Sequence, residues 1–528
     1  MLININQIIS LIEKRDFNRA LVLSLQVLEK NPNEYEFIKA TGLLYLLLEN
    51  FSDSIQYYHQ ALEMNQNDLD VLINLCFAYS EMYDVDRSDY YGKIALDQSP
   101  SNPNIYFNLA ENELKRRGFK KAMDLMERLI LMYGGLQDCA KDLNNRKILT
   151  KYVDVCLSCN LEKEHIIKIF NTILNENFMG DIFHHWCSYD SGTVEQKYIE
   201  LAKQEINSNY ENSVIKSKHV IHLCFALASY YKNDQTLSEK YYVVGNQHAS
   251  KILRYNPIVE QKKILKIKEV FSTPDIINYQ PSQKPLGEGL IFIIGLPRSG
   301  TTLTESILST ADNVVSAGET LIMPNLSKKY YLPNLNYTLH ENDFVEIGQE
   351  YTRIINSLAN NKKFIIDKLP NNFFNVGFIT RALPQAKIIH VSRNKWSNAT
   401  SLFQQLYLTN IPYSSTFFNI GVHMANYEEI MSFWRKQNFI NEKNFLYLEY
   451  ESLVKNTEEM ASRMFAFCGL PGSYSEKKRE GFFARTASKN QVTQKIYSSS
   501  INKEIFMEFR EEFDESLKNR TEYWKRKH

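Results

Sequence analysis

A 34-residue spacing of small and apolar residues is the feature that most limits what the first part of this 528-residue chain can form. Four successive units share the spacing, and its members are Ala20, Ser24 and Val27; Ser54, Tyr58 and Ala61; Ser88, Gly92 and Ala95; and Ala122, Met126 and Leu129. Small side chains at fixed positions let two antiparallel helices approach closely, and each helix pair buries its apolar face only against the next pair. The spacing therefore predicts four stacked helix hairpins over residues 1–138.

Prolines mark the ends of two of these hairpins. Pro32 and Pro100 follow the second helix of their units, where proline cannot continue a helix. The unit length and the Ala/Ser…Ala…Pro pattern resemble tetratricopeptide repeats. The resemblance implies an α-solenoid with a concave binding surface, which we expect to hold a protein or the acceptor substrate; a purely architectural role is the alternative. Residues 139–277 keep a helical pattern without clear register, and we expect a further helical, repeat-like region there.

The composition limits the partners and the compartment. Formal net charge is zero, with 61 basic and 61 acidic residues, so nothing global favours nucleic acid or an acidic membrane surface. The seven cysteines are odd in number and lack framework spacing, which favours a reduced compartment. The first residues lack the basic segment of a signal peptide, and no apolar run approaches the roughly 20 residues of a membrane span. We expect a cytoplasmic protein that binds neither membrane nor nucleic acid.

One group of cysteines and histidines allows a metal alternative. Cys156 and Cys159 form a CxxC pair, and His185 and Cys187 follow about 30 residues later. A zinc site needs four such ligands at matched spacing. The CxxC pair lies in a helix-like context, and the other two candidate ligands, His185 and Cys187, do not have the spacing of a typical zinc motif. The sequence therefore favours buried packing of these residues over a zinc site.

The character of the chain changes after residues 278–289, which contain two prolines and two glycines. The runs 290–295, 363–370 and 386–394 are apolar enough for strands buried on both faces of a parallel sheet. Amphipathic stretches between them predict helical crossovers. We therefore expect an α/β domain over residues 285–528, with ligands at the carboxyl ends of its strands.

The first strand runs into "GLPRSGTT" (295–302), a loop with the glycine spacing of a nucleotide-binding P-loop. Its N–H groups would face an anion at a helix N-terminus. Thr301 stands where a P-loop has its lysine, so the loop suits one phosphate-like group better than a triphosphate with magnesium. The candidate anion-binding residues are Arg298, Ser299, Gly300, Thr301 and Thr302.

A second phosphate position follows the third predicted strand. Arg393 stands at the strand end, and Ser401 follows eight residues later inside a predicted helix. Two phosphate positions without a metal partner indicate a nucleotide that carries two well-separated phosphates.

These motifs together resemble the sulfotransferases that use 3′-phosphoadenosine 5′-phosphosulfate (PAPS). "GLPRSGTT" is similar to their 5′-phosphosulfate loop and "RNKWSNATS" (393–401) to their 3′-phosphate motif. The resemblance covers residues 288 to 525 in order, and with the repeats the whole chain resembles bacterial tetratricopeptide-repeat sulfotransferases, relatives of protein-tyrosine sulfotransferases. It implies an α-solenoid followed by a P-loop-like α/β sulfotransferase domain, PAPS as donor and no metal.

The resemblance also implies roles for single residues. Glu319 in "AGETLIMP" corresponds to the catalytic base, and Lys368 in "DKLPNNF" to the lysine that stabilises the transferring group. Tyr450 corresponds to an adenine-side tyrosine, and the last segment supplies Ser488 as a second transition-state donor and Lys503 as a phosphate contact. The alternatives without a catalytic or binding role are a helix cap for Glu319, a surface salt bridge for Lys368, and packing or capping for the others.

Two further observations leave the acceptor and the activity open. Leu321 and Asn325 stand where protein-tyrosine sulfotransferases carry the arginines that recognise acidic peptides. His390 and His423 are alternative bases, although a histidine inside a strand is more often a core residue. We expect sulfuryl transfer to a hydroxyl of a protein tyrosine, another peptide, a glycan or a small molecule. A non-catalytic nucleotide-binding repeat scaffold and, less favoured, a P-loop kinase are the alternatives.

Overall fold

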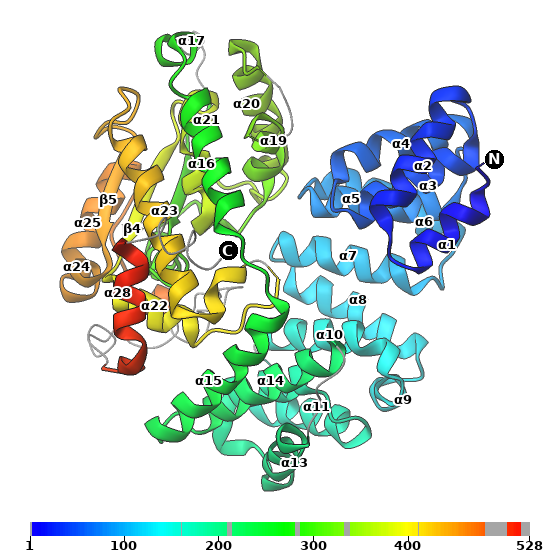
Figure 1. Cartoon of the computed structure of the whole chain (residues 1–528), viewed down its shortest axis with the longest axis horizontal. Coiled ribbons are helices and arrows are strands. Elements are labelled where there is room, and N and C mark those ends of the chain that lie inside the picture. Colours follow the sequence, from blue (N-terminus) through cyan, green and yellow to red (C-terminus); the bar gives the residue numbers. More distant parts are fainter. Residues whose placement is uncertain are drawn as a thin grey trace. The chain divides into compact units, whose positions relative to one another are not determined.

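The computed structural model describes residues 3–159, 161–208, 214–279, 286–331, 338–409, 411–480 and 504–518. Its contacts divide the chain into two compact units (Figure 1). The first contains Met1–Cys139 with Ile354–Asn360, and the second contains Ala140–Arg353 with Asn361–His528. The finer division into residues 1–138, 139–277 and 285–528 stays a prediction.

Successive helix pairs form the first unit, as the spacing predicts. The helices are α1 (Ile5–Glu13), α2 (Phe17–Lys30), α3 (Tyr35–Leu47), α4 (Phe51–Met64), α5 (Leu69–Glu81), α6 (Val85–Gln98), α7 (Pro103–Lys115) and α8 (Phe119–Met132). All the small or apolar positions of the pattern are buried except Val27, which is half-buried. Helix pairs are therefore confirmed, and their tetratricopeptide identity stays a prediction.

Hydrogen bonds explain why serine suits the first position of the pattern. Ser54 in α4 donates to the carbonyl of Gly42 in α3 (2.8 Å), and Ser88 in α6 donates to that of Cys76 in α5 (2.6 Å). A hydroxyl this small lets the helices approach closely while its own polar group remains satisfied.

A residue with left-handed backbone joins the two helices of each pair. The four are Arg15 (φ 59°), Glu49 (φ 58°), Tyr83 (φ 64°) and Arg117 (φ 61°), and they too are 34 residues apart. They are two arginines, a glutamate and a tyrosine, so the backbone conformation recurs without a fixed side chain.

The helical region continues into the second unit. Its elements are α9 (Leu136–Lys141), η1 (Leu143–Asn145), α10 (Arg146–Ser158), α11 (Lys163–Glu176), α12 (Gly180–Asp190), η2 (Ser191–Thr193), α13 (Gln196–Asn207), α14 (Val214–Tyr230), α15 (Gln235–Ile252), α16 (Pro257–Val270) and α17 (Pro274–Asn278). Cys156 and Cys187 are buried core residues. Within the described ranges, no group of three or more His, Cys, Asp or Glu side chains is arranged to hold a metal.

An α/β domain follows, and all of its strand pairs are parallel. Its sheet has the order β2-β3-β1-β4-β5, formed by β1 (Leu290–Gly295), β2 (Val314–Gly318), β3 (Phe364–Asp367), β4 (Lys387–Ser392) and β5 (Phe445–Glu449). The helical elements are α18 (Thr301–Leu308), α19 (Ile322–Tyr331), α20 (Glu341–Asn356), η3 (Pro370–Asn375), α21 (Val376–Ala382), α22 (Lys395–Phe403), η4 (Pro412–Ser415), α23 (Phe417–Arg435), α24 (Tyr450–Lys455), α25 (Thr457–Cys468), α26 (Glu476–Glu480), η6 (Met507–Phe509) and α28 (Arg510–Lys518). The predicted fold class, stacked helices followed by an α/β domain with a parallel sheet, is confirmed.

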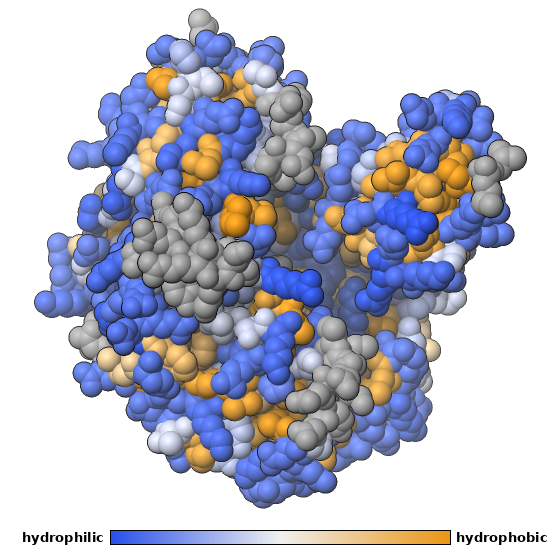
Figure 2. Space-filling model, in the orientation of Figure 1, coloured by the Kyte–Doolittle hydropathy of each residue, from blue (hydrophilic) through white to orange (hydrophobic). Residues whose placement is uncertain are grey.

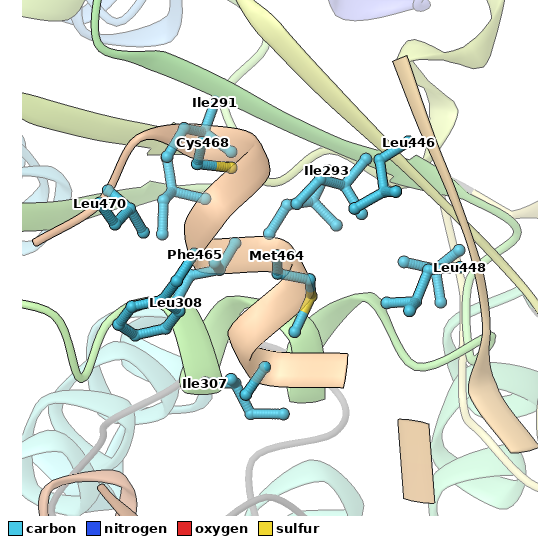
Figure 3. Close-up of a cluster of buried hydrophobic side chains, with 14 of the residues drawn as sticks. Ile291, Ile293, Ile307, Leu308, Leu446, Leu448, Met464, Phe465, Cys468 and Leu470 are labelled. Atoms are coloured by element: carbon cyan, nitrogen blue, oxygen red, sulfur yellow. The ribbon is translucent and has the colours of Figure 1, made fainter. Parts of the chain in front are cut away.

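Both faces of the sheet are covered, which explains its continuous apolar strands. On one face, side chains of β1 and β5 pack against α18 and α25 (Figure 3); labelled members are Ile291, Ile293, Ile307, Leu308, Leu446, Leu448, Met464 and Phe465. On the other face, Phe292 of β1 contacts Tyr351 of α20, with ring centroids 5.4 Å apart. The candidate site described below lies at the carboxyl edge of the sheet.

The helices before the sheet pack directly on this domain. The Phe271 ring, at the end of α16, lies against Phe378 of α21 and Trp434 of α23, with centroids 5.0 and 5.2 Å apart. Arg381 donates to the carbonyls of Tyr279 (2.9 Å) and Ile277 (2.8 Å). Residues 257–279 therefore contribute to the packing of the α/β domain although they precede its first strand.

The described helices include none that is both long and apolar enough to cross a membrane. On the face drawn in Figure 2, hydrophilic residues separate the areas of exposed apolar side chains.

Candidate active site at the carboxyl edge of the sheet

The loop between β1 and α18 has the backbone of an anion cradle. Gly300 caps α18 with left-handed backbone (φ 105°), and Arg298 is also left-handed (φ 68°). Side chains at Gly295 and Gly300 would meet the carbonyl of Val391 and the ring of Tyr450. The first N–H groups of α18 have no partner inside the helix, so the loop presents donors to an anion.

The two predicted phosphate motifs meet at this loop. The Arg298 Nε donates to Ser401 Oγ of α22 (3.0 Å), and the Arg393 Nη1 donates to the Arg298 carbonyl (3.0 Å). Asn398, which the sequence reasoning missed, holds the loop from the same helix by donating to the Pro297 carbonyl (3.0 Å). Residues about 100 positions apart thus form one basic and hydroxyl-bearing cluster.

Tyr450 is close to the same cluster. It is the first residue of α24, and the guanidinium carbon of Arg393 lies 4.5 Å from its ring centroid. Its ring covers Gly300, which is why that position has no room for a side chain. The tyrosine predicted to lie on the adenine side therefore packs between both phosphate motifs.

Buried hydroxyls line the cradle. Ser299, Thr301 and Thr302 are at most 5% exposed. The Ser299 Oγ has no hydrogen-bond partner among the residues that the structure describes. A buried hydroxyl without a partner costs free energy, and a bound phosphate oxygen would satisfy it. The residues of the loop therefore fit a phosphate-type ligand.

Glu319 and Lys368 form a contact pair at the ends of β2 and β3. Lys368 Nζ donates to Glu319 Oε1 and lies 3.8 Å from Glu305 Oε2 of α18. The Lys368 side chain is 1% exposed, whereas that of Glu319 is 43% exposed. Lys368 is therefore no surface salt bridge. Within the described part of the chain, Glu319 is therefore the more accessible member of the pair.

Two supports of this pair escaped the sequence reasoning. Glu305 is 1% exposed, and it accepts a hydrogen bond from Ser316 of β2. A bulge at Ser316 and Gly318 shifts the register of β2 against β3 just before Glu319. The signal for Glu305 was present: it is a single carboxylate in the otherwise uncharged helix "TTLTESIL".

Asp367 precedes Lys368 and faces away from water. It accepts hydrogen bonds from Thr320 (2.6 Å) and Tyr351 (2.7 Å). Burial raises the pKa of Asp367 to about 7, although these two hydrogen bonds act to lower it. The carboxyl therefore links β3 to the residue after Glu319 and to α20.

The two histidines considered as alternative bases are buried. His390 contacts the hydroxyl of Tyr427, and burial lowers the pKa of His390 to about 3. His423 stacks on Tyr413 (centroids 3.6 Å apart), and its Nδ1 lies 2.7 Å from Glu260 Oε1. Both are core histidines, and the sequence favours this reading for His390, which lies inside a strand. The predicted Ser488 and Lys503 lie outside the described residues.

The site thus combines a loop whose residues fit a phosphate-type ligand with a carboxylate–lysine pair in the same α/β domain. Residues 291–476 match the sequence model of the Sulfotransferase family, so this part of the chain is a sulfotransferase-family domain.

A curated relative and two solved structures are similar to the chain. An uncharacterized protein of Aquifex aeolicus (strain VF5) is 33% identical over 260 residues, which make up 44% of this chain and 33% of that protein. The chain therefore spans about a third of the length of this relative.

Among solved structures, the sulfotransferase domain of the Synechococcus PCC 7002 olefin synthase is 17% identical, with 43% of this chain and 90% of that chain covered (TM-score 0.31). Mouse sulfotransferase SULT7A1 complexed with PAP is also 17% identical, with 48% and 93% covered (TM-score 0.29). At these TM-scores the likeness adds nothing to the family match.

Proposed function

We propose that this chain is a PAPS-dependent sulfotransferase that moves a sulfuryl group to an acceptor hydroxyl. The observation that carries the proposal is the Glu319–Lys368 pair. Lys368 is 3.8 Å from Glu305, which belongs to the helix that begins at the anion loop. A base for the acceptor and a cation for the transferring group therefore lie beside the phosphate cradle. The sulfotransferase-family match over residues 291–476 supports this assignment.

The residues that would hold the donor belong to the two phosphate motifs. The backbone of the anion loop, with Arg298 and Ser299, suits the 5′ end, and Arg393 with Ser401 suits the 3′-phosphate. Tyr450 would then lie against the adenosine, and Lys503 stays a predicted phosphate contact. When bound, the donor supplies a sulfuryl group whose bond to a phosphate oxygen breaks as the acceptor oxygen attacks sulfur.

Two residues of the chain would accept the acceptor's proton and stabilise the charge on the leaving oxygen. The Glu319 carboxylate, which is open to solvent, takes the proton of the acceptor hydroxyl while the new oxygen–sulfur bond forms. Lys368 donates hydrogen bonds toward the negative charge that builds on the leaving oxygen. The buried Glu305 holds Lys368 from behind, so the ammonium keeps its position when Glu319 turns to the acceptor.

The acceptor class and the role of the repeats are further parts of the proposal. A protein or peptide hydroxyl, including tyrosine, would use the helical repeats for capture; a glycan or small molecule would not. We expect the reaction to take place in the cytoplasm. Thr301 in the lysine position of the loop disfavours the kinase alternative, and the contact of Lys368 with Glu319 disfavours a scaffold without catalysis.

Binding and transfer can be measured separately on the full chain. Titration calorimetry with adenosine 3′,5′-bisphosphate (PAP) tests the cradle, and transfer from ³⁵S-labelled PAPS to peptide, glycan and phenol acceptors tests the chemistry. We expect PAP to bind and label to reach at least one acceptor class. Absence of both PAP binding and labelling would refute the proposal, and magnesium-dependent ATP hydrolysis would support the kinase alternative.

A further inference from the structure

The proposed base follows a flexible position of the backbone. Glu319 comes directly after Gly318, which ends β2 with left-handed backbone (φ 75°). The register of β2 also shifts between Ser316 and Gly318. Because glycine has no Cβ to limit its rotation, it fixes the direction of the next residue poorly. The position of the Glu319 carboxylate therefore depends on how the chain is held on the other side, at Thr320.

Thr320 is held by the strand that leads to Lys368. Its side chain is fully buried, and its hydroxyl donates to Asp367 Oδ2 (2.6 Å). Asp367 is the last residue of β3 and directly precedes Lys368. On the other side of Glu319, the Gly318 carbonyl accepts a hydrogen bond from the Lys368 amide (2.9 Å). Glu319 thus lies between two hydrogen bonds, and both lead to the end of β3 that carries its lysine partner.

Asp367 is in turn fixed to the body of the domain. The same oxygen, Oδ2, accepts a hydrogen bond from the hydroxyl of Tyr351 in α20 (2.7 Å). Tyr351 lies against Phe292 of the central strand β1. Asp367 and Tyr351 are both buried. Because two hydroxyls share one carboxyl oxygen, that oxygen connects the segment of Glu319 with α20 and with the middle of the sheet.

The group of Thr320, Asp367 and Tyr351 is a poor source of stability. The Asp367 Oδ1 is buried and has no hydrogen-bond partner among the residues that the structure describes. An unsatisfied buried oxygen costs free energy, and apolar residues of similar volume often stabilise a core better than buried polar groups do. A carboxyl supplies what an apolar residue lacks, a directional bond to the Thr320 hydroxyl. The arrangement therefore points to a need for fixed geometry next to Glu319.

We propose that Thr320 is a positioning residue, whose hydrogen bond to Asp367 fixes the direction in which Glu319 presents its carboxylate to the acceptor hydroxyl. The proposal rests on the proposed sulfotransferase function. Proton transfer requires the base to lie within hydrogen-bond reach of the acceptor, and a small displacement of a reacting group lowers the rate strongly. Tyr351 bonds the same oxygen but is not joined to Glu319, so its hydroxyl anchors Asp367 without orienting the base.

Three variants of the full chain separate orientation from stability. Thr320→Val removes the hydroxyl that reaches Asp367, Thr320→Ser keeps it, and the matched control Tyr351→Phe removes the other donor to the same oxygen. Transfer from ³⁵S-labelled PAPS is measured with the peptide, glycan or phenol acceptor that wild type labels best. Thr320→Val should lower kcat about 10- to 100-fold, while the acceptor KM and the Kd for PAP stay within about twofold of wild type.

The other two variants show whether this loss comes from orientation. Thr320→Ser should restore kcat to within about threefold of wild type, because it restores the bond to Asp367. Tyr351→Phe should also keep kcat within about threefold, although its melting temperature should fall about as much as that of Thr320→Val. A merely structural role of Thr320 would instead lower kcat in both variants that lose a hydroxyl.

Hydrogen exchange supplies a readout that needs no acceptor. The Lys368 amide donates to the Gly318 carbonyl, so its exchange reports whether the two strand ends stay together. By mass spectrometry, the peptide that contains Lys368 should exchange about three- to tenfold faster in Thr320→Val than in wild type, Thr320→Ser or Tyr351→Phe.

The outcomes distinguish the inference from the function on which it rests. If wild type binds PAP and transfers label but Thr320→Val keeps the wild-type kcat, or if Tyr351→Phe loses as much kcat as Thr320→Val, the inference is wrong while the proposed function stands. Unchanged exchange of the Lys368 peptide in Thr320→Val would also contradict the inference. If wild type neither binds PAP nor transfers label, the proposed function itself is wrong and the inference falls with it.

Discussion

The repeats and the anion loop both contain residues with left-handed backbone, but the conformation has a different role in each. In the repeats, a left-handed residue recurs every 34 positions as Arg15, Glu49, Tyr83 and Arg117. Two are arginines, one is a glutamate and one is a tyrosine, so the turn needs the bend but no particular side chain. At Arg298 the same conformation occurs once, with its side chain bonded to Ser401 and its carbonyl to Arg393. A left-handed residue points to function where its side chain and its carbonyl are both engaged by distant parts of the chain.

The largest expected effect separates Glu319, the proposed catalytic base, from a glutamate in a turn of the repeats. Glu319→Gln should lower the transfer rate about 10²- to 10⁴-fold, because an amide cannot take the acceptor proton. PAP binding should persist. The matched change Glu49→Gln, in an exposed turn of the repeats, should leave the rate unchanged. Rates from ³⁵S-labelled PAPS measure both. Equal rates for Glu319→Gln and wild type would show that another group is the base.

The next effect compares two residues with left-handed backbone, Arg298 of the anion loop and Glu49 of the repeats. Asparagine tolerates this backbone region, so Arg298→Asn and Glu49→Asn should leave the melting temperature nearly unchanged. Arg298→Asn should weaken PAP binding about 10- to 100-fold, since it removes a charged donor at the cradle. Glu49→Asn should bind PAP as the wild type does. Calorimetric titration measures the affinities, and an unchanged Kd for Arg298→Asn would remove Arg298 from the donor site.

A pair of buried serines sharpens the comparison further. Ser88 of the repeats donates to Cys76 and accepts from Asn112 (2.8 Å), whereas the Ser299 Oγ has no partner among the described residues. Ser88→Ala should destabilise the protein by about 1–2 kcal/mol, because it leaves buried groups unsatisfied. Ser299→Ala should cost almost nothing in stability but weaken PAP binding about three- to tenfold. Thermal unfolding with and without PAP distinguishes the two, and a stability loss at Ser299 without an affinity loss would contradict the cradle.

The last effect is a pH dependence that arises from one buried carboxyl group of the α/β domain. Burial raises the pKa of Asp367 from 3.8 to about 7, so the folded state holds this proton more tightly than the unfolded state. The stability that this proton contributes is present below about pH 4 and is lost as the pH rises to about 7. Asp367→Asn removes the dependence. The unfolding free energy of the variant relative to that of wild type, measured by thermal unfolding, should therefore rise from pH 5 to pH 8 by roughly 2–3 kcal/mol. A constant difference would contradict the raised pKa.

The sequence predicted those parts of the fold that come from a repeated pattern or a known motif. The 34-residue spacing predicted the helix pairs because each pair packs on its neighbour with the same small residues. The recurring turn conformation was missed because Arg, Glu and Tyr share no composition signal for a left-handed bend. The apolar runs predicted the parallel sheet, since strands buried on both faces need no alternation.

The site was predictable only where its residues lie inside motifs. Arg298, Arg393 and Ser401 belong to two short motifs, and the structure brings them together. Glu305 was missed because a lone glutamate in a helix usually marks the solvent side. The hydrogen bond between Thr320 and Asp367 joins residues 47 positions apart in the sequence, which no local pattern encodes.

The hydrogen bond between the Lys368 amide and the Gly318 carbonyl (2.9 Å) determines which changes in the chain would move the two groups of this site. It joins the residue before Glu319 to Lys368 itself, so the separation of carboxylate and ammonium depends on the alignment of two strands. Substitutions in segments away from the ends of these two strands should then leave the separation of the two groups unchanged. A chimera that replaces residues 404–409 should keep the pair, whereas deleting one residue from β2 should turn Glu319 to the opposite face of the sheet.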